Sequence, residues 1–91
     1  MSISVKIPTI LRTYTGGAAT VTVSGDTLSD ALTDLDGQYP GIGARVLDDG
    51  GRLRRFVNVY VNDDDVRFLE DLGTPTPDGA SISIIPAVAG G

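Results

Sequence analysis

The sequence contains no cysteine and no histidine. Without cysteine the chain has no disulfide and no thiolate nucleophile, and without histidine it lacks the commonest general base and the commonest metal ligand. Serine and threonine hydroxyls are plentiful, but a hydroxyl nucleophile needs an activating base, and Lys6 is the only lysine. The carboxylates form no convincing catalytic pair. We therefore expect a protein that is not an enzyme and that binds neither a cofactor nor a metal.

Basic residues and long apolar runs are also scarce. The chain has 7 lysine and arginine residues against 12 aspartate and glutamate residues, a formal net charge of -5. This acidity argues against nucleic acid and anionic membranes as partners and favours a basic partner surface. No apolar run approaches the roughly 20 residues of a membrane span, and residues 1–6 lack the basic start and apolar core of a signal peptide. We expect a cytoplasmic protein.

Alternating apolar and polar residues predict the strands. The first strand covers residues 3–7 before Pro8, and the second covers 19–23, so the two form a hairpin with a long loop. The β-branched and aromatic run 56–61 predicts a third strand, followed by a turn at 62–65 and a short partner strand at 66–68. A last strand follows Asp78-Gly79 and ends near Pro86.

One main helix is predicted between the second and third strands. Thr27 and Asp30 have the spacing of a capping box, and Pro40-Gly41 ends the pattern. The apolar face consists of Leu28, Ala31, Leu32, Leu35 and Tyr39. Residues 42–47 indicate a short second helical face, and 70–77 indicate a turn or a single helical turn. Because 91 residues suffice for one domain, the element order predicts an α+β fold: a mixed sheet with one main helix packed across it, as in a β-grasp.

The chain ends in a thin segment, Ala87, Val88, Ala89, Gly90 and Gly91. Glycine has no Cβ, so such a segment fits a narrow enzyme channel where larger side chains would clash. Its reactive group is the Gly91 carboxylate, which is a poor electrophile until another enzyme activates it as an acyl-phosphate or acyl-adenylate. We expect a domain at 1–86, a flexible tail at 87–91, and a chain that serves as a substrate.

An apolar docking patch is predicted beside this tail. Ile82 and Ile84 share one face of the last strand, so Ile85 falls on the outer face next to Pro86. A bulge or a covering loop at Ile85 is the alternative. If the valines of 57–61 are in the core, Phe56 and Tyr60 face outward and extend the patch, although packing on the other side of the sheet explains them equally well.

Two charged clusters have simpler explanations than binding. Arg52, Arg54 and Arg55 suit a phosphate or an acidic partner, but a solvated loop is the favoured interpretation. Residues 63–65 are three consecutive aspartates, yet the glycine and the distant glutamate of a calcium loop are absent in register. A solvated turn is therefore favoured there.

The ending of the chain, together with two upstream motifs, resembles the ubiquitin-like sulfur carriers of the MoaD and ThiS type. Residues 84–91, Ile-Ile-Pro-Ala-Val-Ala-Gly-Gly, are similar to the family ending of a hydrophobic residue, proline, a spaced valine and two glycines. Val61-Asn62 and Asp78-Gly79 lie at the expected distances upstream, and the resemblance spans nearly the whole chain. Residues 7–12, 55–58 and 60–63 resemble the CysO subfamily of actinobacteria, which supplies sulfur for cysteine.

This resemblance implies a specific chemistry for the tail. A ubiquitin-activating-type enzyme, the sulfurylase, would use ATP and magnesium to adenylate Gly91, and a sulfur donor would displace AMP to leave a C-terminal thiocarboxylate. The implied partners are a pyridoxal-phosphate-dependent cysteine synthase that accepts the sulfur and a zinc metalloprotease that releases cysteine. Residues 85–90, Phe56 and Tyr60 would contact partners, and the carrier would be a monomer that visits them in turn.

Other functions use the same tail and stay open at this stage. The sulfur could instead serve molybdopterin, thiazole or a sulfur-containing secondary metabolite. A ubiquitin-like modifier would join the activated glycine to lysines of other proteins, and a non-covalent interaction module would not use the tail at all. One sequence does not display the partner surfaces that separate these pathways.

Overall fold

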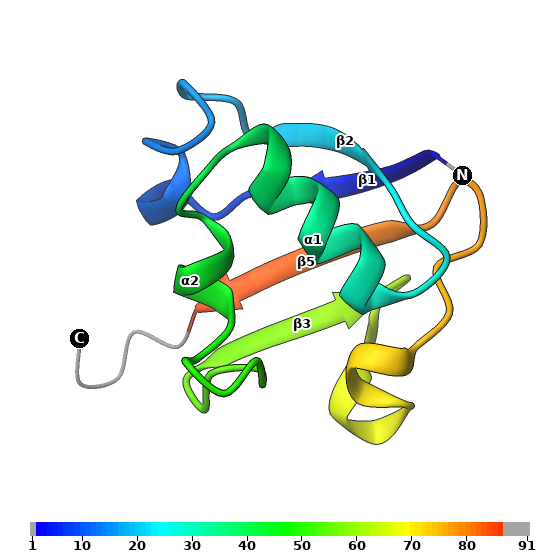
Figure 1. Cartoon of the computed structure of the whole chain (residues 1–91). Coiled ribbons are helices and arrows are strands. Elements are labelled where there is room, and N and C mark those ends of the chain that lie inside the picture. The colour runs from blue at the N-terminus through cyan, green and yellow to red at the C-terminus, as the bar shows by residue number, and fades with distance from the viewer. Residues whose placement is uncertain (1, 87–91) are drawn as a thin grey trace.

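The structure, a computed structural model, describes residues 2–86 and consists of a five-stranded sheet with one main helix across one face (Figure 1). The strand order is β2-β1-β5-β3-β4. β1 and β5 are parallel, and the other neighbouring pairs are antiparallel. The bounds of the strands are β1 Ser2–Lys6, β2 Thr20–Ser24, β3 Val57–Val61, β4 Asp64–Asp65 and β5 Ser81–Pro86.

The mixed sheet follows from the predicted alternation of side chains. β1 and β2 form the expected hairpin, with Ser2 opposite Ser24 and Lys6 opposite Thr20. Their apolar residues are buried and their polar residues are exposed, because successive side chains of a strand point to opposite faces. β5 lies between β1 and β3, so the last strand is held from both sides in the middle of the sheet. The predicted α+β class is confirmed.

The main helix, α1 Leu28–Gln38, also follows the sequence pattern. The Thr27 hydroxyl oxygen accepts a hydrogen bond from Asp30 N at 3.3 Å, which is one of the two bonds of the predicted capping box. The predicted apolar face packs on the sheet, with four buried residues and a half-buried Tyr39: Leu28, Ala31, Leu32 and Leu35. The short second helix is α2 Gly43–Val46, whose Val46 is buried together with the preceding Ile42.

The prediction of a strand at 66–68 is wrong. These residues form the 3-10 helix η2 Val66–Phe68, and the partner strand is β4, which comes earlier. Asn62 and Asp63 have φ angles of 50° and 76°, so the hairpin turn needs only these two residues and pairing resumes at once. Asp65 then ends the strand because its side chain accepts a hydrogen bond from Arg67 N at 2.9 Å and caps η2.

Two further 3-10 helices complete the described chain, η1 Thr9–Leu11 and η3 Asp71–Gly73. η3 lies within the segment predicted as a turn or a single helical turn, and it contacts α1. The division of the chain into a domain at 1–86 and a tail at 87–91 stays a prediction, because residues 87–91 lie outside the described range.

Candidate functional site

The carboxyl end of β5 is the part of the fold that carries the predicted tail. Pro86 is the last described residue, and it still pairs with Val57 of β3. Since β5 is bonded to β1 and β3, this end of the strand is held by the centre of the sheet. The predicted site residues Ala87, Val88, Ala89, Gly90 and Gly91 lie outside the described residues.

Ile85 lies on the outer face of the sheet, as predicted. Its side chain is 48% exposed, whereas that of Ile84 is 3% exposed and lies in the core. Ile85 is directly opposite Asn58 of β3 in the regular ladder, so neither a bulge nor a covering loop hides it. Pro86 is half-buried beside it.

Phe56 and Tyr60 share this outer face. Val57, Val59 and Val61 are buried, so the alternate residues of β3 point away from the core. Phe56 is 59% exposed and Tyr60 is half-buried. Each is two residues from Asn58, which places both on the diagonals next to Ile85. We define the outer apolar patch as Ile85, Phe56 and Tyr60.

Arg67 borders this patch, although the sequence did not indicate it. One terminal nitrogen donates to Asn58 Oδ1 at 2.9 Å, and the other donates to the Arg54 carbonyl oxygen at 2.8 Å. The guanidinium therefore ties η2 to the middle of β3 and to the loop before it. The signal in the sequence was only its position after an aspartate-rich turn, which does not specify these partners.

The loop before β3 is held by hydrogen bonds and carries several charges. Arg54 Nε donates to the Ala44 carbonyl oxygen of α2 at 2.9 Å. The Asp48 carboxylate accepts from Arg52 N at 3.0 Å and from Gly50 N at 2.9 Å. The hydrogen bond from Arg52 N is the main cause that lowers the pKa of Asp48 below its ordinary value of 3.8. Desolvation opposes this shift, and the Gly50 bond and the nearby Arg54 and Arg52 charges add to it.

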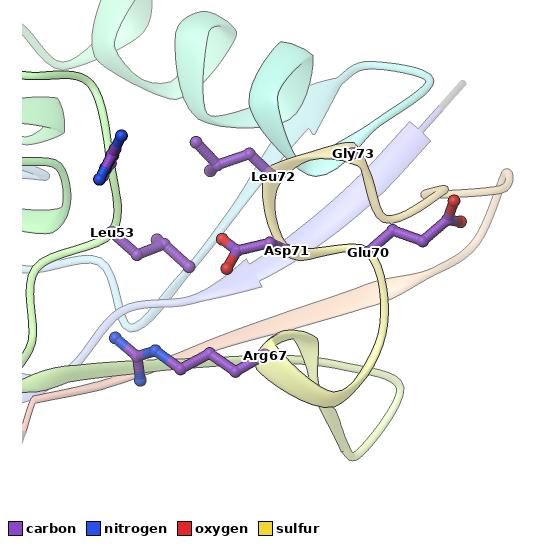
Figure 2. A pocket seen from close by; sticks show the side chains of 7 residues that line it. Leu53, Arg67, Glu70, Asp71, Leu72 and Gly73 are labelled. Carbon is purple, nitrogen blue, oxygen red and sulfur yellow. The ribbon is translucent and has the colours of Figure 1, made fainter.

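One cavity of the fold is lined by charged and apolar side chains. It has a volume of about 570 Å³ and lies between η2, η3 and the loop before β3. Figure 2 shows Arg67, Asp71 and Leu72 extending toward this space, whereas Glu70 points away from it. Its lining contains no hydroxyl, thiol or imidazole group that could act as a nucleophile. The full lining consists of Arg52, Leu53, Arg67, Glu70, Asp71, Leu72 and Gly73.

Neither a metal-binding cluster nor a helix able to cross a membrane is present among residues 2–86. No group of three or more histidine, cysteine, aspartate or glutamate side chains in that range is arranged to hold a metal ion. No helix in the same range has the length and apolar character needed to cross a membrane.

The chain is similar to a family model and to curated proteins over most or all of its length. The model of the ThiS family matches residues 5–91. The sulfur carrier protein CysO of Mycobacterium tuberculosis is 54% identical over 93 residues, with 100% of both chains covered. Small archaeal modifier protein 3 of Haloferax volcanii is 37% identical over 65 residues, which cover 71% of this chain and 70% of the relative.

A solved structure extends this similarity to three dimensions. The chain resembles one chain in the crystal structure of the Amycolatopsis orientalis BexX/CysO complex. The TM-score is 0.92 and the identity 47%, and the match covers 98% of this chain and 99% of the matched chain. This neighbour has the β-grasp fold, so the predicted fold is confirmed. Carriers of this kind act as substrates of partner enzymes and not as catalysts. The chain therefore belongs to the ThiS family and is a ubiquitin-like sulfur carrier protein of the CysO type.

Proposed function

We propose that Gly91 carries the sulfur as a C-terminal thiocarboxylate. The Gly91 carboxylate attacks the α-phosphate of ATP in a ubiquitin-activating-type enzyme that uses magnesium, and pyrophosphate leaves. Hydrosulfide then attacks the acyl carbon of the adenylate, AMP leaves with the former carboxylate oxygen, and the sulfur-bound proton is lost, so that one carboxylate oxygen is replaced by sulfur. The chain supplies the acyl group, and the partner enzyme supplies the catalysis.

The observation that carries this proposal is the 54% identity to a sulfur carrier over the whole chain. The fold supports it because β5, in the centre of the sheet, leads directly toward the glycines. Because a rigid strand precedes the small residues, a partner enzyme can bind the folded domain while it reacts with the end of the chain.

We propose that the sulfur is destined for cysteine, because the relatives named CysO cover the complete chain. A pyridoxal-phosphate-dependent cysteine synthase would accept the sulfur, and a zinc metalloprotease would release cysteine from the carrier. Pathways to molybdopterin, thiazole or sulfur-containing secondary metabolites use the same carrier chemistry. The solved neighbour was crystallised with BexX, which supports a partner protein that receives a CysO-type carrier. The carrier itself would be monomeric and would work in the cytoplasm.

The outer apolar patch is the surface that we propose for docking to these enzymes. Ile85 immediately precedes Pro86, the last described residue, and Phe56 and Tyr60 lie on the two diagonals next to Ile85. An exposed apolar patch next to a reactive end gains free energy when a partner covers it.

Intact mass spectrometry tests the chemistry. The purified chain is incubated with its adenylating enzyme, ATP, magnesium and sulfide, and a chain lacking Gly91 is the control. We expect a mass gain equal to the replacement of one oxygen by one sulfur, located at Gly91 by fragmentation and absent from the control. No gain with an enzyme that is active on another carrier would refute the proposal.

A second function, protein modification, is favoured by one observation. The relative that covers 71% of this chain is a small archaeal modifier protein. In that role the activated Gly91 would form an amide with lysines of other proteins. Immunoblots of cells with an antibody against this chain would then show a ladder of covalent adducts, which a chain lacking Gly91 would not produce.

A further inference from the structure

Arginines are concentrated at one end of the sheet, measured along the axis of β5. β3 starts where β5 ends because the two strands are antiparallel, so the loop before β3 lies at the tail end of the sheet (Figure 1). We define the arginine loop as Arg52, Arg54 and Arg55. Arg12 follows β1 at the same end, since β1 is parallel to β5.

The turns at the opposite end of the sheet carry negative charge. These turns lie at 24–27, 62–64 and 77–80, and they contain aspartates and no lysine or arginine. Those aspartates are Asp26, Asp63, Asp64 and Asp78. A chain with a net charge of -5 therefore presents a cationic surface at the end from which its tail departs.

The arginine loop is exposed and in place before any partner arrives. Arg54 is anchored to α2 through its bond to the Ala44 carbonyl oxygen, and Arg55 lies over the Phe56 ring with its guanidinium carbon 5.5 Å from the ring centroid. A cavity of about 350 Å³ is lined by Arg54 and Arg55 together with Asp48, Phe56 and Val57. The Asp48 carboxylate and that of the adjacent, exposed Asp49 offset part of the positive charge on one side of the loop.

The length of the tail limits which surface of the domain can contact an enzyme that acts on Gly91. Five residues follow Pro86, and five residues of any conformation span at most about 18 Å. An enzyme that acts on Gly91 must therefore bring its own surface close to Pro86. Val57 pairs with Pro86 and is two residues from Arg55, so the arginine loop faces that enzyme.

We propose that the arginine loop docks onto an acidic rim around the channel that admits the tail. The partner that binds the arginine loop is thus the adenylating enzyme. The arginines would contact aspartate and glutamate side chains at the entrance of its channel. Such a rim repels the rest of this acidic chain and attracts only the tail end, so the carrier approaches with the tail first. The inference rests on the proposed function, in which Gly91 is the reacting residue.

The rate of thiocarboxylate formation tests this inference. At low carrier concentration the rate gives kcat/KM, and at saturating carrier concentration it gives kcat. The ionic strength is raised from about 0.01 M to about 0.15 M, where the Debye length falls from about 30 Å to about 8 Å. For the unaltered chain we expect kcat/KM to fall with added salt while kcat stays constant. Arg55 is the residue to change, because it is exposed and its only described contact is with Phe56.

Three variants separate local charge from net charge. Arg55→Gln should lower kcat/KM about twofold to fivefold at low ionic strength, leave kcat unchanged and weaken the salt dependence. Arg55→Lys keeps the charge and should restore the unaltered values. Ser29→Glu has the same net charge as Arg55→Gln but adds its charge in the first turn of α1, near the acidic end, and should have little effect.

The outcomes distinguish this inference from the proposed function. Two results would refute docking to an acidic rim while thiocarboxylate formation continues. One is an equal effect of Arg55→Gln and Ser29→Glu, and the other is a kcat/KM of the unaltered chain that does not change with salt. If no thiocarboxylate forms even at saturating carrier, the proposed function fails, and the inference fails with it.

Discussion

Ile85 and Ile84 are adjacent residues with opposite expected effects on folding and on docking. The exposed fractions of their side chains are 48% and 3%, because one faces outward and the other faces the core. Ile85→Thr keeps a β-branched side chain suited to a strand while it makes the outer apolar patch more polar. We expect this variant to fold normally and to engage the adenylating enzyme more weakly.

The magnitude follows from the exposed fraction. Complete burial of an isoleucine side chain contributes about 1.5–3 kcal/mol. Since 48% of Ile85 is still exposed in the free chain, a partner that covers it gains about 0.7–1.5 kcal/mol. This corresponds to about a threefold to tenfold increase in KM for Ile85→Thr, with kcat unchanged, because the interaction is present before and during the reaction.

The matched control is Ile84→Ala. This substitution removes methyl groups from the core and should cost about 2–5 kcal/mol of unfolding free energy, measured by urea denaturation. At temperatures where Ile84→Ala is still folded, its KM should stay near that of the unaltered chain. If Ile85→Thr leaves KM unchanged, or if it destabilises the fold as much as Ile84→Ala does, the assignment of Ile85 to a docking surface is refuted.

Two further predictions concern folding. Because the pKa of Asp48 is lowered from its ordinary value of 3.8 in the folded chain, the unfolded chain binds more protons at this carboxylate near and just below that pH. The stabilisation by Asp48 is therefore present above that pH and lost as the pH falls through the folded pKa, so urea denaturation should show a difference from Asp48→Asn at neutral pH that disappears in acid. Gly37→Ala, whose Cβ would meet nothing within 4 Å, should stabilise α1 by about 0.5–1 kcal/mol, whereas Gly25→Ala, whose Cβ would lie 2.5 Å from Ala31 N, should cost about 1–3 kcal/mol. Equal effects of the two alanines in thermal denaturation would contradict the described approach of Gly25 to α1.

Periodicity predicted the main elements because each is buried on one side only. The alternation around Val5 and the helical spacing around Leu32 report which side of an element meets the core, and the structure buries both residues. The same reasoning placed Ile85 outside, since a regular strand leaves it no other face. These features depend on local pattern, which a single sequence displays directly.

The strand predicted at 66–68 failed because composition does not report where a turn ends. Val66 and Phe68 suit a strand by propensity. The positive φ angles of Asn62 and Asp63 shorten the turn, and the Asp65 cap then turns the chain into η2. Side-chain hydrogen bonds to the local backbone therefore overrode propensity at this point.

The distribution of charge could not be predicted for a different reason. The net charge of -5 favoured a basic partner surface, and as a sum over the chain it still does. The net charge does not say where on the molecule each charge lies. Arg12 and Arg55 lie at one end of the sheet only because β1 runs parallel to β5 while β3 runs antiparallel to it. Since the tail departs from that same end, the partner of the reactive carboxylate meets these arginines before the aspartates of the opposite end. In the proposed docking, the arginine loop therefore prefers an acidic partner surface, whereas the net charge of the whole chain favours a basic one.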